Sequence, residues 1–162
     1  MSRIFTLRLT AFAAVVLLWS GCAGGSTTIG EGPSGLDPSH PTTTITLPDG
    51  AQVTAELAIT REAQTQGMMF RTNLRPGEGM LFPFEEMAPR AFWMFQTLVP
   101  LDIIWLDDNK RIVEISANSP PCRTVLDDCP TYGGSAHSTY VLELAAGQAA
   151  AHKLTVGSQL EF

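Results

Sequence analysis

The chain has 162 residues, of which 44% are apolar and 16% are charged, and its formal net charge is −6. This length suits a single domain, and the apolar fraction excludes disorder of the whole chain because it is enough to build a core. An acidic surface repels phosphate backbones, so no nucleic acid partner is expected.

Residues 1–21 have the pattern of a bacterial export signal. Arg3 and Arg8 supply positive charge, and an apolar run from Leu9 to Trp19 follows them. Because a helix that crosses a bilayer needs about 20 residues, this run is too short for a permanent span and suits a signal peptide. Removal of the two arginines with the signal changes the formal charge from −6 to −8.

The signal ends at Ser20-Gly21-Cys22, which resembles the lipobox of bacterial lipoproteins. In a lipobox, small residues precede a cysteine that is lipidated and becomes the mature N-terminus; Trp19 stands here where leucine is usual. The resemblance implies a lipid anchor (palmitate included) on Cys22 and a protein of the cell envelope that faces the periplasm. Ala23 is typical of lipoproteins sent to the outer membrane. The alternative is an ordinary secretory signal with an incidental cysteine.

The remaining cysteines, Cys122 and Cys129, are separated by six residues. Outside the cytoplasm such a pair usually forms a disulfide, which is the prediction here. A redox-active pair is usually Cys-x-x-Cys at the start of a helix, and this spacing differs. Residues 22–42 are rich in Gly, Pro, Ser and Thr and are predicted to form a flexible tether, which leaves residues 43–162 as one β-rich domain.

Alternating apolar residues flank a turn at Pro48-Asp49-Gly50 and predict a first β-hairpin, from about residue 43 to 59. Thr60 and Gly67 are placed to cap a short helix over 61–66. Further strands are predicted at 79–82, 91–97, 101–106, 111–117, 139–144 and 158–162, with loops at 73–79, 83–90 and 118–137 and a helical turn at 147–153. About seven or eight strands with one or two short helices predict a mainly β fold, either a small β-sandwich or a jelly-roll-like barrel.

Four blocks of residues, taken together, resemble a family of bacterial and archaeal proteins, the domain of unknown function 192. The blocks are Gly67-Met68-Met69-Phe70-Arg71 with Leu74; Gly79-Met80-Leu81-Phe82; Phe92-Trp93-Met94 with Thr97 and Pro100-Leu101-Asp102; and Tyr140-Val141-Leu142-Glu143 with Gly147 and Gly157. The resemblance extends over roughly residues 44–162, the whole domain. The resemblance implies a compact β-sandwich or jelly-roll-like domain that is often exported, and it brings no established activity. The family usually has Lys-Asn where this chain has Phe95-Gln96, so the charge of that lysine is missing here.

Charged residues within these blocks are candidate ligand contacts. The Arg71 guanidinium could clamp a carboxylate or phosphate, or form a salt bridge with Asp102 or Glu143. Asp102 has apolar neighbours and must therefore be paired or have a raised pKa; it suits either a general base or a structural cap. Strict alternation along 140–144 places Glu143 on the face opposite Leu142, where it is free to face water.

Aromatic and sulfur-containing side chains are also concentrated in this region. Trp93, with Phe92, Phe95 and Trp105, either lines an apolar groove or fills the core. Five methionines fall within residues 68–94; thioethers can bind Cu(I), but methionine also fills irregular cores, and no histidine lies near them in the sequence. We therefore expect no metal and no cofactor.

No nucleophile and base stand in a recognisable pattern, which favours binding over catalysis. The prediction is a non-enzymatic envelope module that binds a small ligand or a partner on a concave face bounded by the loops at 72–79, 83–90 and 118–137. Two alternatives remain open. One is a hydrolase whose Arg71, Asp102 and Glu143 converge in one cleft, and the other is a structural component of an envelope complex.

Overall fold

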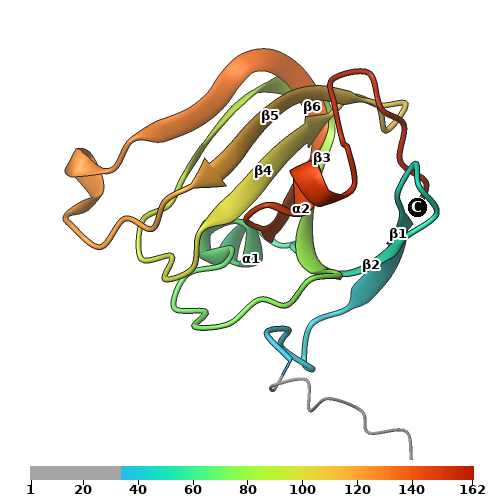
Figure 1. Cartoon of the computed structure of the whole chain (residues 1–162). Helices are drawn as coiled ribbons and strands as arrows, with labels where there is room; N and C mark the ends of the chain where they lie inside the picture. Colours follow the sequence, from blue (N-terminus) through green and yellow to red (C-terminus); the bar gives the residue numbers. More distant parts are fainter. Residues whose placement is uncertain (1–33) are drawn as a thin grey trace, which may run out of the picture. The chain divides into compact units, whose positions relative to one another are not determined.

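The computed structural model describes residues 34–162 and places six strands in one mixed sheet. The strands are β1 (Thr42–Thr46), β2 (Gln52–Leu57), β3 (Glu78–Trp93), β4 (Leu101–Leu106), β5 (Ile112–Ser119) and β6 (Thr131–Ala145). Their order across the sheet is β1-β2-β3-β6-β4-β5, and only β2 and β3 run parallel (Figure 1). The predicted signal, Cys22 and the first part of the tether lie outside the described residues.

Two short α-helices, α1 (Arg61–Gln66) and α2 (Gln148–Ala151), accompany the sheet, with a 3-10 turn at Leu126–Asp128. The predicted caps of α1 are confirmed: the Thr60 hydroxyl accepts a hydrogen bond from the Ala63 amide at 3.1 Å, and Gly67 ends the helix at a φ of 48°. Within residues 34–162, no helix has the length and apolarity that a membrane crossing requires.

Both predicted hairpins are confirmed. In the first, β1 pairs antiparallel with β2 and Ile45 lies opposite Val53, so that both face the core. In the second, β4 pairs antiparallel with β5, and every residue of β4 is buried. This strand is covered on both faces, which is why its sequence is a nearly continuous apolar run.

The predicted number of strands, seven or eight, is wrong because the predicted strands at 79–82 and 91–97 form one long strand and because residues 158–162 form no strand. β3 continues from Glu78 to Trp93 through the predicted loop at 83–90. Its pairing with β6 shifts register between Pro83 and Ala88 and again between Pro89 and Ala91, and such irregularities tolerate prolines. In the same way, β5 and β6 take up both ends of the predicted loop at 118–137.

The C-terminal segment lies against both edges of the sheet. The predicted strand at 158–162 consists instead of two isolated bridges, one between Gln159 and Arg111 and one between Glu161 and Thr46. These single bridges connect the start of β5 with β1 without closing the sheet. The prediction of a mainly β fold is therefore confirmed, whereas the fold is one open six-stranded mixed sheet and not a closed barrel.

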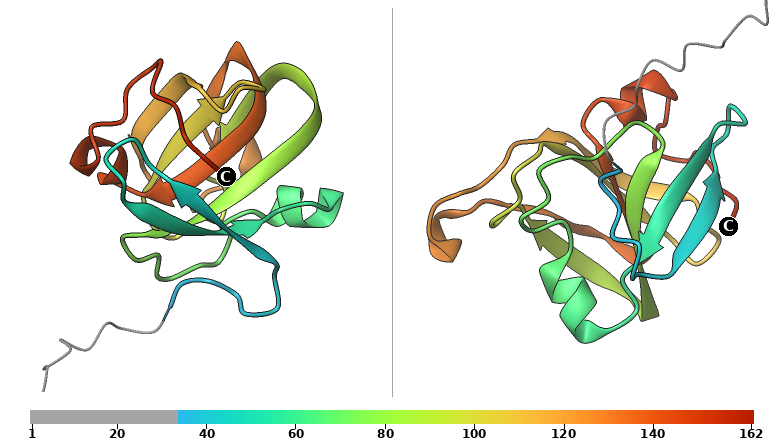
Figure 2. Two further views of the ribbon diagram at one scale, coloured as in Figure 1. Left: turned by 90° about the vertical axis from the view of Figure 1, so that its right-hand side faces the viewer. Right: turned by 90° about the horizontal axis from the view of Figure 1, so that it is seen from below.

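The two faces of the sheet carry separate apolar clusters. One contains Leu81, Ile104, Leu142 and Leu144 together with residues of β1, β2, α2 and the C-terminal segment. The other contains Met80, Ile103, Trp105 and Val141 together with Met68, Leu74 and Met94. Figure 2 shows α1 and α2 on opposite sides of the sheet, in keeping with the two clusters.

The predicted disulfide is present between Cys122 and Cys129, with the Cα atoms 5.8 Å apart. Its loop is attached to the chain that follows β3. The Cys122 amide donates to the Met94 carbonyl at 3.1 Å, and the Gln96 amide donates to the Cys122 carbonyl at 2.9 Å. The disulfide loop therefore holds the segment that contains Phe95, a residue that lines the cavity described next.

Candidate functional site

A cavity of about 390 Å³ opens on the face of the sheet that α1 covers. α1 and the turn after it supply one wall, β3 supplies the opposite wall, and Glu143 of β6 lies between them. The aromatic lining residues are Phe82, Phe84, Phe92, Trp93 and Phe95, and the charged ones are Arg61, Arg90 and Glu143. Ligand pockets of this size with apolar walls and a few polar groups are common in proteins.

Glu143 is the buried acid of this cavity, with 4% of its surface exposed. It lies between Met80 of β3 and Ile103 of β4 in the sheet, and both of these neighbours are apolar and buried. Its Oε2 atom has no hydrogen-bond partner. Burial raises the pKa of the Glu143 carboxyl to about 8, so the group is mainly protonated at neutral pH.

The cavity wall around Glu143 is rich in aromatic residues. The Phe82 and Phe92 rings meet edge to face at 5.1 Å, and Phe92 meets Trp105 in the same way at 6.0 Å. Gly67 brings the backbone close to the acid: a Cβ atom there would lie 3.4 Å from the Phe82 ring and 3.9 Å from Glu143 Oε2. The glycine that ends α1 therefore also leaves room beside the carboxyl.

Arg90 is the second polar group of the cavity that lacks a full set of partners. Its guanidinium carbon lies 3.6 Å from the centre of the Phe84 ring, and Nη2 donates to the Glu86 carbonyl at 2.6 Å. Its Nε atom is buried without a partner. Partial burial lowers the pKa of Arg90 from its usual value, although the guanidinium remains charged.

Asp102 lies away from this cavity, on the other face of the sheet. It is fully buried opposite Leu144, and its two oxygens accept hydrogen bonds from the Asn118 amide at 2.8 Å and from the Ala149 amide, in the first turn of α2, at 2.7 Å. This is the structural cap that the sequence left open as one role of Asp102. Its carboxylate fixes α2 and the end of β5 and is not available to a ligand at the cavity.

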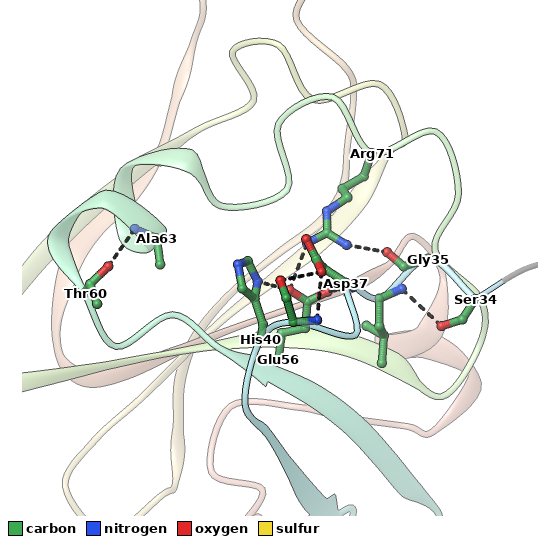
Figure 3. Close-up of polar contacts among 10 residues, drawn as sticks. Ser34, Gly35, Asp37, His40, Glu56, Thr60, Ala63 and Arg71 are labelled. Carbon is green, nitrogen blue, oxygen red and sulfur yellow. Dashed lines mark hydrogen bonds and ion pairs between the residues drawn. The ribbon is translucent and has the colours of Figure 1, made fainter.

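Arg71 likewise has a structural role. Its Nη2 donates to Glu56 at 2.8 Å, and its Nη1 donates to the Gly35 carbonyl at 2.6 Å. Glu56 is fully buried and also accepts from the Asp37 amide and contacts His40 Nδ1, each at 2.6 Å. Figure 3 shows these groups converging on Glu56. The predicted salt bridge of Arg71 exists, but with Glu56 and not with Asp102 or Glu143.

A second buried acid, Glu78, holds the same N-terminal segment. It accepts hydrogen bonds from the Ser34 hydroxyl, the Gly35 amide and the Arg75 guanidinium. Burial alone would raise the pKa of Glu78, but these hydrogen bonds outweigh it and lower the pKa to about 2. Residues 34–40, predicted as the end of the flexible tether, are therefore bound to the domain through Glu56 and Glu78.

Of the four candidate ligand contacts, the structure brings Trp93 and Glu143 together at the cavity. Arg71 and Asp102 lie elsewhere, so the condition for the hydrolase alternative, convergence of the three charged residues, is not met. The concave face is also only partly as predicted. Residues from 84–91 line the cavity, whereas those of 72–79 and 118–137 do not.

Sequence analysis overlooked Arg61 and Arg90 as cavity residues. Arg61 was assigned only to the helix and Arg90 to a loop, yet both line the cavity. A signal existed for Arg90, because a charged residue two positions from the aromatic pair Phe92-Trp93 would share a face with Phe92 in a continuous strand. The prolines at 83 and 89 concealed that continuity.

The chain matches the model of domain of unknown function 192 (DUF192), described as "Uncharacterized ACR", over residues 44–162. The chain belongs to the DUF192 family. None of the curated proteins compared with it matches. The family assignment agrees with the four blocks of residues that suggested it, which supply Gly67, Phe82, Trp93 and Glu143 to the cavity.

Two solved structures resemble this DUF192 domain. One is a protein of Sinorhizobium meliloti 1021 described as a candidate transcription regulator, with 30% identity and a TM-score of 0.69 over 78% of this chain and 97% of that one. The other is a protein of unknown function from Novosphingobium aromaticivorans DSM 12444, with 31% identity and a TM-score of 0.65 over 78% of this chain and 91% of that one. They support the fold and the family.

Proposed function

We propose that this DUF192 domain is a non-enzymatic module that binds a small ligand in the cavity lined by α1, β3 and Glu143. The observation that carries the proposal is the Glu143 carboxyl, which is 4% exposed and has an oxygen without a partner while it lines an aromatic cavity. Buried polar atoms in folded proteins nearly always have hydrogen-bond partners. A bound molecule would supply the missing one.

The residues that line the cavity with Glu143 favour binding over catalysis. In the part of the chain that the structure describes, no second acid, histidine, serine or cysteine lines the cavity. General acid–base or nucleophilic catalysis usually needs a second group within hydrogen-bond reach of the first. Thr65 and Thr97 also line the cavity, but neither forms a hydrogen bond with Glu143 in the described residues. Glu143 can therefore hold a ligand but has no bonded partner with which to pass a proton.

A ligand screen by thermal shift tests this proposal on the full-length protein. A compound that binds the folded state raises the melting temperature as its concentration rises. Thr65→Trp, at an exposed helix position on the cavity, should abolish the shift by blocking the mouth. The matched control is Ala150→Trp, at an exposed position of α2 on the far side of the sheet, which should preserve it. Shifts that survive Thr65→Trp, or a screen without any hit, would contradict the proposal.

The module is further proposed to be a lipoprotein of the cell envelope, facing the periplasm and anchored to the outer membrane through Cys22. The export pattern of residues 1–21 and the cysteine that follows support this placement, and a disulfide at Cys122–Cys129 suits an oxidising compartment. Mass spectrometry should find an acylated Cys22 at the N-terminus of the mature protein. Cys22→Ser should release the protein from the membrane fraction. An unmodified cysteine in a cytosolic fraction would overturn the placement.

No nucleic acid partner is included in the proposal, although one structural relative is described as a candidate transcription regulator. The net charge of −6 opposes association with a phosphate backbone. The charged groups at the cavity also belong to a pocket of about 390 Å³, a size that suits a small molecule.

A further inference from the structure

Two of the polar atoms that the fold leaves unsatisfied belong to residues of the same cavity. In residues 34–162, four buried side-chain nitrogen or oxygen atoms have no hydrogen-bond partner: Arg90 Nε, Glu143 Oε2, Ser138 Oγ and Thr139 Oγ1. The first two residues line the cavity, and the other two do not. Leaving a buried donor or acceptor unsatisfied is costly, so this pairing at one pocket points to a missing ligand.

Both groups are hydrogen-bond donors at neutral pH. An Arg Nε–H can only donate, and a protonated carboxyl donates through its hydroxyl. Glu143 is mainly protonated at neutral pH because burial raises its pKa and no cation offsets this effect: the charged groups that face the cavity are Arg61 of α1 and Arg90 of β3, and neither forms an ion pair or hydrogen bond with it. The residues of β4 on this face, Leu101, Ile103 and Trp105, carry no charge.

The cavity is therefore positively charged. The lining residues Arg61 and Arg90 contribute two cations, and Glu143, the acid among the lining residues, is mainly protonated at neutral pH. The Glu86 carboxylate is near enough to Arg90 to oppose the fall in its pKa, but Glu86 does not line the cavity. Among the described residues, no carboxylate lies within salt-bridge distance of either arginine; Arg90 bonds the backbone carbonyl of Glu86 and not its side chain. Guanidinium groups in such settings bind carboxylates with charge-assisted hydrogen bonds.

The apolar walls of the cavity indicate the rest of the ligand. Phe82, Phe92, Trp93 and Met68 are among the apolar residues that line the space. These walls favour an apolar and flat ligand body, because burying such surface is worth roughly 25 cal/mol per Å². Two donors and two cations among apolar lining residues specify the complementary chemistry in a ligand: a negatively charged acceptor on an apolar body.

We propose that the cavity binds a small organic carboxylate with an apolar, ring-containing body, whose oxygens accept hydrogen bonds from the Glu143 carboxyl and the Arg90 guanidinium. This inference rests on the proposed binding function and names its ligand class. An amine with the same body is disfavoured, because its charge would meet two arginines and its N–H groups would meet two donors.

A series of probes with one body and three head groups tests the inference. We would measure the binding of 3-phenylpropionate, 3-phenylpropan-1-ol and 3-phenylpropylamine to the full-length protein by calorimetry at pH 7. The carboxylate should bind at least about tenfold more tightly than the alcohol, and the amine should bind most weakly. Tightest binding by the amine would overturn the inference while leaving a small-ligand function in place.

Variants test the two proposed donors. Arg90→Gln should weaken carboxylate binding about tenfold or more, whereas Arg123→Gln, on an exposed residue of the disulfide loop, should leave it unchanged. Glu143→Gln keeps an N–H donor and should retain binding, and Glu143→Leu should lose it. Equal effects of Arg90→Gln and Arg123→Gln would contradict the assignment of Arg90.

The pH dependence supplies a readout that a purely structural role would not move. As Glu143 ionises above neutral pH, it loses its donor proton and repels a carboxylate, so affinity for 3-phenylpropionate should fall between pH 7 and 9.5. In Glu143→Gln the affinity should stay flat over this range. Affinity that rises with pH in the wild type would overturn the inference. If neither these probes nor any library compound binds in the cavity, the proposed function fails as well.

Discussion

Three buried glutamates, Glu56, Glu78 and Glu143, differ in the hydrogen-bond partners of their carboxyl groups. Glu56 contacts His40 and accepts hydrogen bonds from Arg71 and the Asp37 amide. Glu78 accepts hydrogen bonds from Ser34, Arg75 and the Gly35 amide. Glu143 Oε2 has no hydrogen-bond partner among the described residues. The pKa of Glu78 accordingly falls to about 2, and that of Glu143 rises to about 8. All three acids are buried, so the presence or absence of hydrogen-bond partners distinguishes the two structural acids from the candidate ligand-binding acid.

The free energy of unfolding should fall as the pH rises because of the raised pKa of Glu143. Below its usual pKa of 4.5 the carboxyl is protonated in both the folded and the unfolded chain. Between 4.5 and about 8 only the unfolded chain releases the proton, so the free energy of unfolding falls by up to about 1.4 kcal/mol per pH unit. Above the folded pKa the loss is complete.

Glu143→Gln does not titrate at this position, so its stability advantage over the wild type should grow from pH 5 to pH 8. Urea unfolding at several pH values measures this difference. The matched control is Glu85→Gln on an exposed residue of β3, which should show no such trend. A constant difference between Glu143→Gln and the wild type would show that the carboxyl is ionised in the folded protein.

At the scale of elements, residues 34–40 behave as part of the domain although they contain no helix or strand. Their backbone and side chains bond two buried carboxylates, Glu56 of β2 and Glu78 of β3. Figure 3 shows the contacts to Glu56 and the bond from Arg71 to the Gly35 carbonyl. Composition predicted a flexible tether here because glycine, proline and serine predominate. The anchors of this segment are acids up to 44 residues away in the sequence, which no local pattern reveals.

Removal of this segment should destabilise the domain. A chain that begins at Pro41 leaves Glu56 without His40 and the Asp37 amide, and Glu78 without Ser34 and the Gly35 amide. Since hydrogen bonds to charged groups contribute about 1.5–3 kcal/mol each, the free energy of unfolding should fall by roughly 3 kcal/mol or more. Urea unfolding of this chain is compared with that of a chain beginning at Ser34, which keeps every one of these contacts. Equal stability of the two chains would show that the segment is not bound in solution.

Strand lengths illustrate a second limit at this scale. Pro83, Pro89 and the acids between them predicted a loop, because proline cannot donate a hydrogen bond within a ladder. β3 nevertheless continues through this stretch, with register shifts against β6 where the prolines fall. That continuity carries Arg90 and Trp93 to the cavity wall, so the prediction of two strands in place of β3 and the omission of Arg90 have one origin.

For the domain as a whole, the sheet separates Asp102 from Glu143. The two acids lie on the adjacent strands β4 and β6, and the ladder pairs Asp102 with Leu144 and Ile103 with Glu143. Neighbouring positions on a strand point to opposite faces, so the two carboxyls cannot share a cleft. Alternation in the sequence already placed Glu143 opposite Leu142; it could not say that Asp102 would lie on the other side.

The sequence by itself determined the local features of this protein: two hairpins from period-2 patterning, the caps of α1 at Thr60 and Gly67, the cysteine pair, and the family through four blocks of residues. Only the tertiary structure decided that Glu143 is buried without a partner, that Arg71 belongs to Glu56, and that residues 34–40 bind the domain. The physical reason is range. Patterning and capping depend on residues a few positions apart, whereas burial and the supply of hydrogen-bond partners depend on strands that meet only after the chain has folded.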